Sequence, residues 1–380
     1  MAKLGEICAF QSGGTPSKNK PEYFGGEIPW ISTTALNGGK INEADAVAWI
    51  TPKAIRESAA KIVPANSIMV GTRVGIGKVA INTVEMSTSQ DVISLIGIDK
   101  DKWYKPYLCK LLLSKKDYFN SQARGATIKG IKIDVVANID VPEIDYATQR
   151  KVAATLNKID TLIVLRKQQL AKLDELVKAR FVEMFGDINV NNKKWMTYPL
   201  GELCTIVRGG SPRPIERYLG GTIPWIKIGD ATTGENIYLN STKEYIIQEG
   251  VKKSRMIKAG SLIFANCGVS LGFARIITFD GCIHDGWLAM EDIDEKLDKI
   301  FLLYSLNQMT EYFRKTAPAG TQPNLNTNIM KMHRQIVPPM EMQKAFISFV
   351  KCADRQKQIV QQSLEKLELM KKALMQEYFG

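Results

Sequence analysis

The chain has 380 residues, of which 45% are hydrophobic and 24% are charged, a composition typical of a globular protein with two or three domains. Neither an apolar run of ~20 residues nor a signal-peptide core is present, so we predict a cytoplasmic protein that does not enter a membrane. The six cysteines form no CxxC pair and there are two histidines, which argues against a zinc site or a disulfide framework.

The net charge of +12 is compatible with a nucleic-acid partner, but it is spread evenly over the chain. Residues 1–146 and residues 187–340 each have 18 basic and 15 acidic side chains, a net charge of +3 (18 − 15). A basic face on either segment therefore requires that its charges be separated in space.

Residues 1–146 are predicted to form a first globular domain of mixed α and β structure. Short runs of β-forming residues such as 67–70 are separated by turns rich in Gly, Pro, Asn and Thr, and a helical stretch is expected at 105–120. Three motifs mark the segment: L-G-E-I-C at 4–8, S-G-G-T-P at 12–16 and G-G-E-I-P-W-I at 25–31.

Residues 147–186 are predicted to form one long spacer helix. Seam residues, mostly apolar, recur there at alternating spacings of three and four over nearly five heptads, which is the a/d pattern of a coiled coil. At 1.5 Å per residue the stretch 148–185 would span roughly 55 Å. The seam positions are Val152, Leu156, Ile159, Ile163, Arg166, Leu170, Leu173, Val177, Arg180 and Met184.

Residues 187–340 repeat the first segment at an offset of 194–196 residues. The three motifs return in the same order, as L-G-E-L-C at 200–204, R-G-G-S-P at 208–212 and G-G-T-I-P-W-I at 220–226. The sequence therefore predicts a second domain of the same fold, with a β run at 261–264 and a helical stretch at 299–315.

Residues 341–380 repeat the spacer helix. Each basic seam residue of one helix aligns with an apolar residue of the other, so a homodimer of like helices would bring like charges together. We therefore predict antiparallel pairing within one chain, the alternative being that each helix packs separately on its own domain. The seam positions are Phe346, Val350, Ala353, Lys357, Val360, Leu364, Leu367, Lys371, Leu374 and Tyr378.

The predicted fold class is α+β: two similar mixed α/β domains separated by two long helices that form an antiparallel intramolecular coiled coil. Apolar residues beside both seams widen the stripe beyond what a two-helix contact requires. Such a surface predicts a docking site for helices of partner proteins, unless the chain's own domains cover it. These residues are Leu162, Leu165 and Leu176 in the first helix and Ile347, Met370 and Met375 in the second.

This layout resembles the specificity subunit of type I restriction-modification systems. The resemblance rests on the L-G-E start, the G-G-T-P and G-G-S-P turns, I-P-W-I, P-x-x-S-I-M-V-G-T at 64–72, and a helix that opens with Gln149-Arg150-Lys151 and closes in Phe-Gly. It covers essentially the whole chain and depends on an ordered set of motifs that occurs twice. Only three residues precede L-G-E, so we expect a compact form of this subunit.

The resemblance implies that each globular segment is a target-recognition domain that reads one half of a split double-stranded DNA site. The helices would set the separation of the half-sites and dock two modification subunits, which bind S-adenosylmethionine and methylate adenine. Motor-nuclease subunits with ATP and magnesium would complete the restriction complex.

Reading base edges requires polar and cationic side chains on loops. The matched loops of the two segments share glycines and differ in side chains, as expected if one scaffold reads two different half-sites. The candidates are Ser12, Thr15, Ser17, Lys18, Arg73, Lys78, Ser89, Gln90, Arg124, Thr127 and Lys129 in the first segment, and Arg208, Ser211, Arg213, Asn266, Arg275, His284, Asp285, Thr321, Gln322, Asn324 and Asn326 in the second.

No H-E-x-x-H, Walker A or G-x-S-x-G motif is present, so we expect a non-catalytic subunit that binds no cofactor or metal of its own. The main alternative is a non-enzymatic structural or carbohydrate-binding protein with two modules on a coiled-coil spacer, which the basic charge disfavours. An enzyme with a site in each repeat is less consistent with the sequence, because duplicated catalytic residues should match and these polar positions do not.

Overall fold

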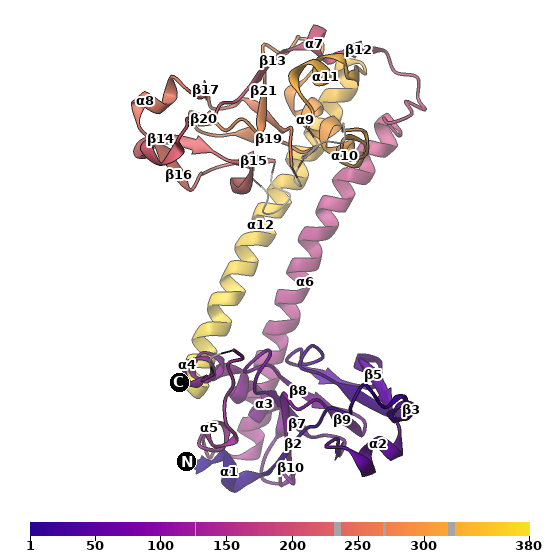
Figure 1. Ribbon diagram of the computed structural model, residues 1–380, viewed down its shortest axis with the longest axis vertical. Coiled ribbons are helices and arrows are strands. Elements are labelled where there is room, and N and C mark those ends of the chain that lie inside the picture. The colour runs from indigo at the N-terminus through magenta and orange to yellow at the C-terminus, as the bar shows by residue number, and fades with distance from the viewer. Residues whose placement is uncertain (126, 232–236, 269–270, 318–323) are drawn as a thin grey trace. The chain divides into compact units, whose positions relative to one another are not determined.

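The computed structural model describes residues 1–380 except 126, 232–236, 269–270 and 318–323. Contacts within the chain divide it into two compact units (Figure 1). Unit 1 is Met1–Lys167 with Gln362–Gly380, and unit 2 is Gln168–Gln361. Each unit therefore combines one globular domain with part of each long helix.

The strands of unit 1 are β1 (Ala2–Lys3), β2 (Ala9–Ser12), β3 (Phe24–Ile31), β4 (Lys40–Ile41), β5 (Ala48–Ile50), β6 (Ile62–Val63), β7 (Ile68–Gly71), β8 (Val79–Asn82), β9 (Met86–Thr88), β10 (Val92–Ile96) and β11 (Asp140–Val141). One mixed sheet has the order β2-β10-β7-β8-β4, with only β4 and β8 parallel. A second has the order β5-β3-β9-β6, with only β3 and β9 parallel. Strand β1 pairs with β11.

The strands of unit 2 are β12 (Thr197–Pro199), β13 (Thr205–Arg208), β14 (Leu219–Ile226), β15 (Tyr238–Leu239), β16 (Glu244–Ile246), β17 (Arg255–Ile257), β18 (Leu262–Ala265), β19 (Ala274–Ile277), β20 (Gly281–Ile283), β21 (Trp287–Glu291) and β22 (Arg334–Ile336). Their sheets have the orders β13-β21-β18-β19-β15, β16-β14-β20-β17 and β12-β22. Each order is that of unit 1 with eleven added to every strand number. The sequence repeat is thus a repeat of topology.

The five-stranded sheet is the middle layer of each globular domain. In β7 the side chains of Ile68 and Val70 belong to the core on the helix side, whereas Met69 belongs to the core shared with the second sheet. This alternation follows from the two-residue period of a strand. Because both faces are covered, β7 is apolar throughout rather than alternating with polar residues.

The short helices of unit 1 are α1 (Leu4–Ile7), α2 (Pro52–Glu57), α3 (Lys105–Ser114), α4 (Lys116–Gln122) and α5 (Ile133–Ala137), and those of unit 2 are α7 (Leu200–Leu203), α8 (Gln248–Val251), α9 (Lys299–Gln308), α10 (Thr310–Thr316) and α11 (Thr327–Met332). The stretches 105–120 and 299–315 are helical as expected, but each forms two consecutive helices. Each stretch is divided by one non-helical residue, Lys115 or Met309, whose N–H bonds to a carbonyl three residues earlier. The tight turn brings Phe119 and Phe313 into their cores.

The two long helices are α6 (Tyr146–Phe185) and α12 (Met340–Phe379), each of 40 residues. Each begins one residue before the segment predicted for it, 147–186 or 341–380. In unit 1, Asp160 of α6 forms an ion pair with Lys371 of α12 at 2.6 Å, and Arg166 Nε donates to Ser363 Oγ at 3.1 Å. The residue number of the contact in α12 falls as the residue number in α6 rises. The two helices are therefore antiparallel, which confirms the prediction.

Acidic partners explain how basic residues fit into the seam. In unit 1, Asp160 accepts hydrogen bonds from Lys371 and from Lys110 of α3, each at 2.6 Å. Burial opposes ionisation of Asp160, but these two lysines outweigh it and lower its pKa. In unit 2, Lys357 forms an ion pair with Asp174 across the seam. Both seam lysines are therefore neutralised by the facing helix.

One buried histidine makes the stability of unit 2 depend on pH. The ring of His333 packs on Phe313 with centroids 5.1 Å apart, and its Nε2 is buried without a partner among the described residues. Burial lowers the pKa of His333 to about 4. The unfolded chain has an ordinary histidine pKa near 6.5, so below that pH it binds a proton that the folded unit does not, and folding stability falls as the pH drops from ~6.5 toward 4.

We expect a loss of up to about 2 kcal/mol in the free energy of unfolding between pH 7.5 and pH 5 from this residue. Urea denaturation of the wild type and of His333→Leu at both pH values measures it, since every other titrating group is common to the two proteins. An equal pH effect in both proteins would show that His333 does not cause the loss.

Candidate nucleic-acid interface

Four loop segments of unit 1 meet at one edge of the five-stranded sheet. Strand β2 ends, β7 ends and β10 begins at this edge, because β10 is antiparallel to both neighbours. Backbone hydrogen bonds join the segments: Gly14 N–H donates to Thr88 O at 2.9 Å, Thr72 N–H to Asp91 O at 2.8 Å, and Ile131 N–H to Thr72 O at 2.8 Å. Residues 12–18, 72–78, 89–91, 124–125 and 127–131 thus form one frame.

Unit 2 has the same frame. Gly210 N–H donates to Ile283 O at 3.0 Å, Asn266 N–H to Gly286 O at 2.9 Å, and Leu325 N–H to Asn266 O at 2.8 Å. The glycine-rich turns permit this approach, because a Cβ at Gly13 would lie 2.2 Å from Ser89 O and one at Gly209 would lie 2.1 Å from His284 O. The shared glycines therefore preserve the frame and leave the other side chains free to differ.

In unit 1 the frame presents most of the predicted side chains to solvent. Ser89 is the exception, because it is buried and its Oγ has no partner among the described residues. Arg73 approaches Asp91 at 3.9 Å, and the backbones of Arg124 and Gly130 bridge to each other at 2.9 Å. The exposed predicted residues are Ser12, Thr15, Ser17, Lys18, Arg73, Lys78, Gln90, Arg124, Thr127 and Lys129.

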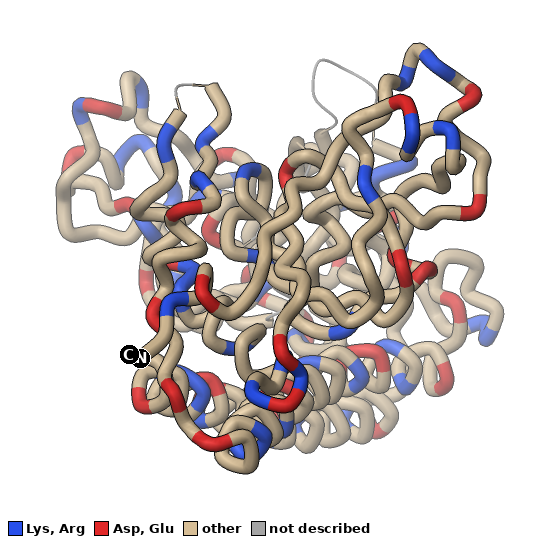
Figure 2. The backbone as a smooth tube through the Cα atoms, turned by 90° about the horizontal axis from the view of Figure 1, so that it is seen from below, with Lys and Arg blue, Asp and Glu red and all other residues tan. Residues whose placement is uncertain are grey.

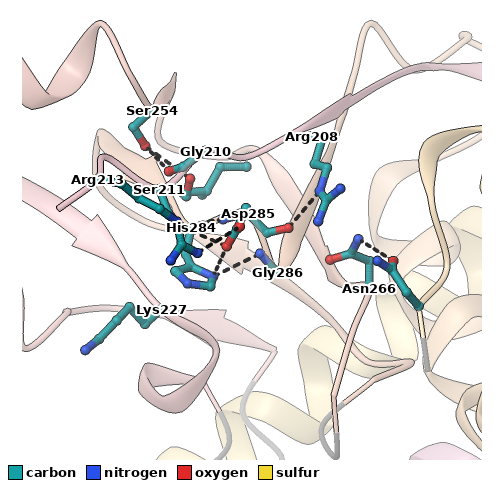
Figure 3. Close-up of polar contacts among 12 residues, drawn as sticks. Arg208, Gly210, Ser211, Arg213, Lys227, Ser254, Asn266, His284, Asp285 and Gly286 are labelled. Atoms are coloured by element: carbon teal, nitrogen blue, oxygen red, sulfur yellow. Dashed lines mark hydrogen bonds and ion pairs between the residues drawn. The ribbon is translucent and has the colours of Figure 1, made fainter. Parts of the chain in front are cut away.

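In unit 2 the predicted residues form a charged cluster around Asp285 (Figure 3). Ser211 Oγ donates to Asp285 Oδ1 at 2.8 Å, and Arg213 lies 3.9 Å from Oδ2. Arg208 Nε donates to the backbone oxygen of Asp285 at 2.9 Å. At the matching positions unit 1 has neutral side chains, Ser12 for Arg208 and Gln90 for Asp285.

His284 also belongs to this cluster, as a neutral imidazole. Its Nδ1 lies 2.9 Å from Gly286 N and 3.0 Å from Asp285 Oδ1. Burial lowers the pKa of His284 and Asp285 only partly opposes this, so the imidazole is neutral at pH 7. A neutral Nδ1 accepts the Gly286 N–H, which places the ring proton on Nε2. Ser211, rather than His284, therefore supplies the hydrogen bond to the carboxylate.

The structure places two predicted residues of unit 2 away from solvent. Asn266 is buried and donates to Asn324 Oδ1 at 3.2 Å. Arg275 is in the middle of β19, where it pairs with Ile263 and takes the position that Ala80 has in β8. It is 9% exposed and stacks on Phe273, so we exclude it from the proposed contacts. Asn324 is half-buried and Asn326 is exposed, whereas Thr321 and Gln322 lie outside the described residues.

Sequence reasoning missed Lys227, which lies beside His284 and helps to lower its pKa. Its ammonium contacts the Glu244 carboxylate and lies 5.6 Å from the ring centroid of Trp225. The sequence could have indicated Lys227, because it directly follows the second I-P-W-I motif at the position where the first copy has Ser32. The tryptophans of the two I-P-W-I motifs both serve packing. Trp225 is buried, and half-buried Trp30 donates to Gly14 O at 3.0 Å.

Charge is not segregated by segment. Figure 2 shows Lys and Arg interleaved with Asp and Glu along the backbone. The loops at this edge therefore carry individual charged side chains rather than a uniform basic field. Within the described ranges no cluster of His, Cys, Asp and Glu could hold a metal ion, and no helix has the length and apolar character needed to cross a membrane.

The helix pair has an apolar flank and a charged flank in unit 1. Lys167 and Glu368, both at heptad position e, form an ion pair at 3.0 Å. On the same flank Asp160 binds Lys110 of the globular domain. Leu162 and Met370 occupy g positions on the other flank and are 41% and 52% exposed. The domain thus packs against the charged flank and leaves the apolar flank open.

The other predicted docking residues divide into two groups. Leu165 in unit 1 and Leu176 in unit 2 are each 50% exposed, as expected for a docking surface. The prediction for Ile347 was wrong, because it is buried in the core of unit 2. Met375 is half-buried against the core of unit 1. Sequence reasoning also missed Ile359, which is 60% exposed.

The comparisons with known proteins identify the family. Residues 1–175 and 192–369 each match the model of the type I restriction modification DNA specificity domain. The chain belongs to this family. It is 27% identical over 391 residues to the type I restriction enzyme MjaIX specificity subunit of Methanocaldococcus jannaschii. The alignment covers 95% of this chain and 89% of that relative.

A second relative and two solved structures agree with this assignment. The chain is 30% identical over 192 residues to the EcoR124I/EcoR124II specificity subunit of Escherichia coli, covering 49% of this chain and 46% of that one. A chain from a study of complex assembly and conformational transition of the type I R-M system has a TM-score of 0.67 at 18% identity, covering 100% and 96%. The S subunit from M. genitalium has a TM-score of 0.56 at 15% identity, covering 100% and 95%. Both structures show that this specificity subunit has the S-subunit fold.

Proposed function

We propose that this specificity subunit reads a bipartite double-stranded DNA site, one half-site with the loop edge of each unit. The observation that carries the proposal is the loop frame itself, which occurs twice with the same backbone hydrogen bonds and with different polar side chains. A fixed backbone with variable side chains is what sequence-specific readout of two half-sites requires. The alternative of a carbohydrate-binding module is not favoured for a member of this family.

Catalysis belongs to partner subunits in this proposal. Two modification subunits would supply S-adenosylmethionine-dependent methylation of adenine, and motor-nuclease subunits would use ATP and magnesium. Co-expression of the chain with a type I modification subunit, followed by sequencing of methylated adenines in DNA exposed to the complex, tests the proposal. We expect a split motif with a fixed gap that disappears when this chain is omitted. Methylation that does not depend on the chain would contradict the proposal.

We further propose that the apolar flank of the helix pair docks the modification subunits. The exposed side chains at Leu165 and Met370 in unit 1, and at Leu176 and Ile359 in unit 2, support this, because the repeat offset of 194 residues relates the two pairs. Each unit therefore offers one apolar residue from each helix. Two equivalent surfaces suit two copies of one partner.

Leu165→Glu is expected to weaken binding of the modification subunit by about 1.5–3 kcal/mol, or roughly 10- to 100-fold, because a charge would be buried in an apolar contact. Titration calorimetry with the purified modification subunit measures the change. Gln168→Glu is the matched control, since it adds the same charge at an exposed position three residues away. Equal affinities of both variants would exclude this flank as the docking surface.

A further inference from the structure

Arg208 and Asp285 are held together on the loop edge of unit 2. Arg208 is the last residue of β13, and Asp285 lies two residues beyond the end of β20. The bond from Arg208 Nε to Asp285 O at 2.9 Å joins the two positions (Figure 3). Unit 1 has the same frame with Ser12 and Gln90, so neither charged side chain is needed to build it.

The guanidinium of Arg208 is oriented before any ligand arrives. Its Nε is occupied by Asp285 O, and in the described part of the chain neither terminal nitrogen has a hydrogen bond or an ion pair. The side chain is exposed. The two terminal N–H groups therefore form a fork that can donate to two acceptors side by side, as guanine O6 and N7 are in the major groove.

The carboxylate of Asp285 is also held in place before any ligand arrives. Its Oδ1 accepts from Ser211 Oγ at 2.8 Å, whereas the nearest cation to Oδ2 is Arg213 at 3.9 Å, beyond hydrogen-bond distance. Oδ2 thus keeps acceptor capacity. A carboxylate is repelled by DNA phosphates, so its place at a DNA-facing edge suits an amino group on a base, such as cytosine N4.

We propose that Arg208 and Asp285 together read one G·C base pair in the half-site that unit 2 binds. Arg208 donates to guanine O6 and N7, and Asp285 accepts from cytosine N4. A G·C pair satisfies both side chains, because it offers two adjacent acceptors on one base and a donor on the other. An A·T pair offers one acceptor on each base, adenine N7 and thymine O4, so neither base presents two adjacent acceptors to the fork of Arg208. The inference rests on the proposed function.

Methylation mapping with Arg208→Ala and Asp285→Asn tests the pair. The wild-type motif should contain a G·C pair at one position of one half-site, and both variants should relax that same position. We expect discrimination there to fall roughly 10- to 100-fold, while the other half-site stays unchanged. Asp285→Asn keeps the size of the side chain and an oxygen for Ser211. Ser12→Ala and Gln90→Ala are the matched controls in unit 1 and should alter only the other half-site.

Three results would overturn the inference while leaving the proposed function intact. One is a wild-type half-site without G·C at the affected position, another is relaxation of different positions by the two variants, and the third is a uniform loss of methylation with an unchanged motif. The last result would mean that the residues only support the loop. Absence of any methylated motif that depends on the wild-type chain would overturn the proposed function and this inference with it.

Discussion

Insertion of one heptad into both long helices, after Lys167 and after Gln361, is expected to widen the gap in the recognised DNA site by about three base pairs. Seven helical residues add ~10 Å, and B-DNA rises 3.4 Å per base pair. A whole heptad preserves the seam register, so the bases read in each half-site should not change. Three base pairs also turn the duplex by roughly 100°, which should slow methylation because the DNA must twist.

Sequencing of methylated adenines from cells that express the lengthened chain measures the new gap. Insertion of seven Gly and Ser residues at the same two places is the control, because a flexible insertion does not hold a distance and should not yield one defined gap. A gap that stays unchanged in the heptad variant would show that the helices do not set the spacing of the half-sites.

Phe346→Ala is expected to destabilise unit 2 by about 3–5 kcal/mol. Phe346 of α12 is fully buried, and its ring makes edge contacts with Phe181 and Phe185 of α6 at 5.3 and 5.6 Å and with Tyr304 of α9 at 5.3 Å. Truncation removes these aromatic contacts and leaves a cavity where both long helices meet the domain. This is a large fraction of the roughly 5–15 kcal/mol by which a typical domain is stable.

Urea denaturation followed by tryptophan fluorescence measures the effect. Phe349→Ala is the matched control on the same helix, because Phe349 is half-buried and should cost less than half as much. A loss below about 2 kcal/mol for Phe346→Ala would mean that the core collapses around the missing ring.

The repeat and the seams were within reach of sequence analysis. Hydrophobic spacing is a local property, so the a/d pattern identified Val152, Leu156 and Ile159 as buried seam residues, and the structure confirms this. Repetition of motifs in a constant order predicted two domains of one topology, which the matching strand orders confirm. The loop edge was anticipated in part, because shared glycines mark the turns where backbones approach closely.

Tertiary structure decided which of the marked residues belong together. Arg275 lies inside β19 at the position that Ala80 has in β8, an offset of 195 residues, whereas the exposed Lys78 precedes β8, so these two predicted residues do not occupy equivalent places. Ile347 was predicted to be on a free surface, but the domain of unit 2 covers it.

The sequence by itself determined that this protein has two similar domains and two long helices that pair. Local periodicity and internal repetition can be detected along the chain without knowledge of its three-dimensional structure. Only the tertiary structure decided that Arg208 meets Asp285, 77 residues further along the chain, and that Lys227 lies beside His284. Contacts of this kind depend on strand order and on the ends at which strands stop. Those are set by packing over the whole domain rather than by neighbouring residues.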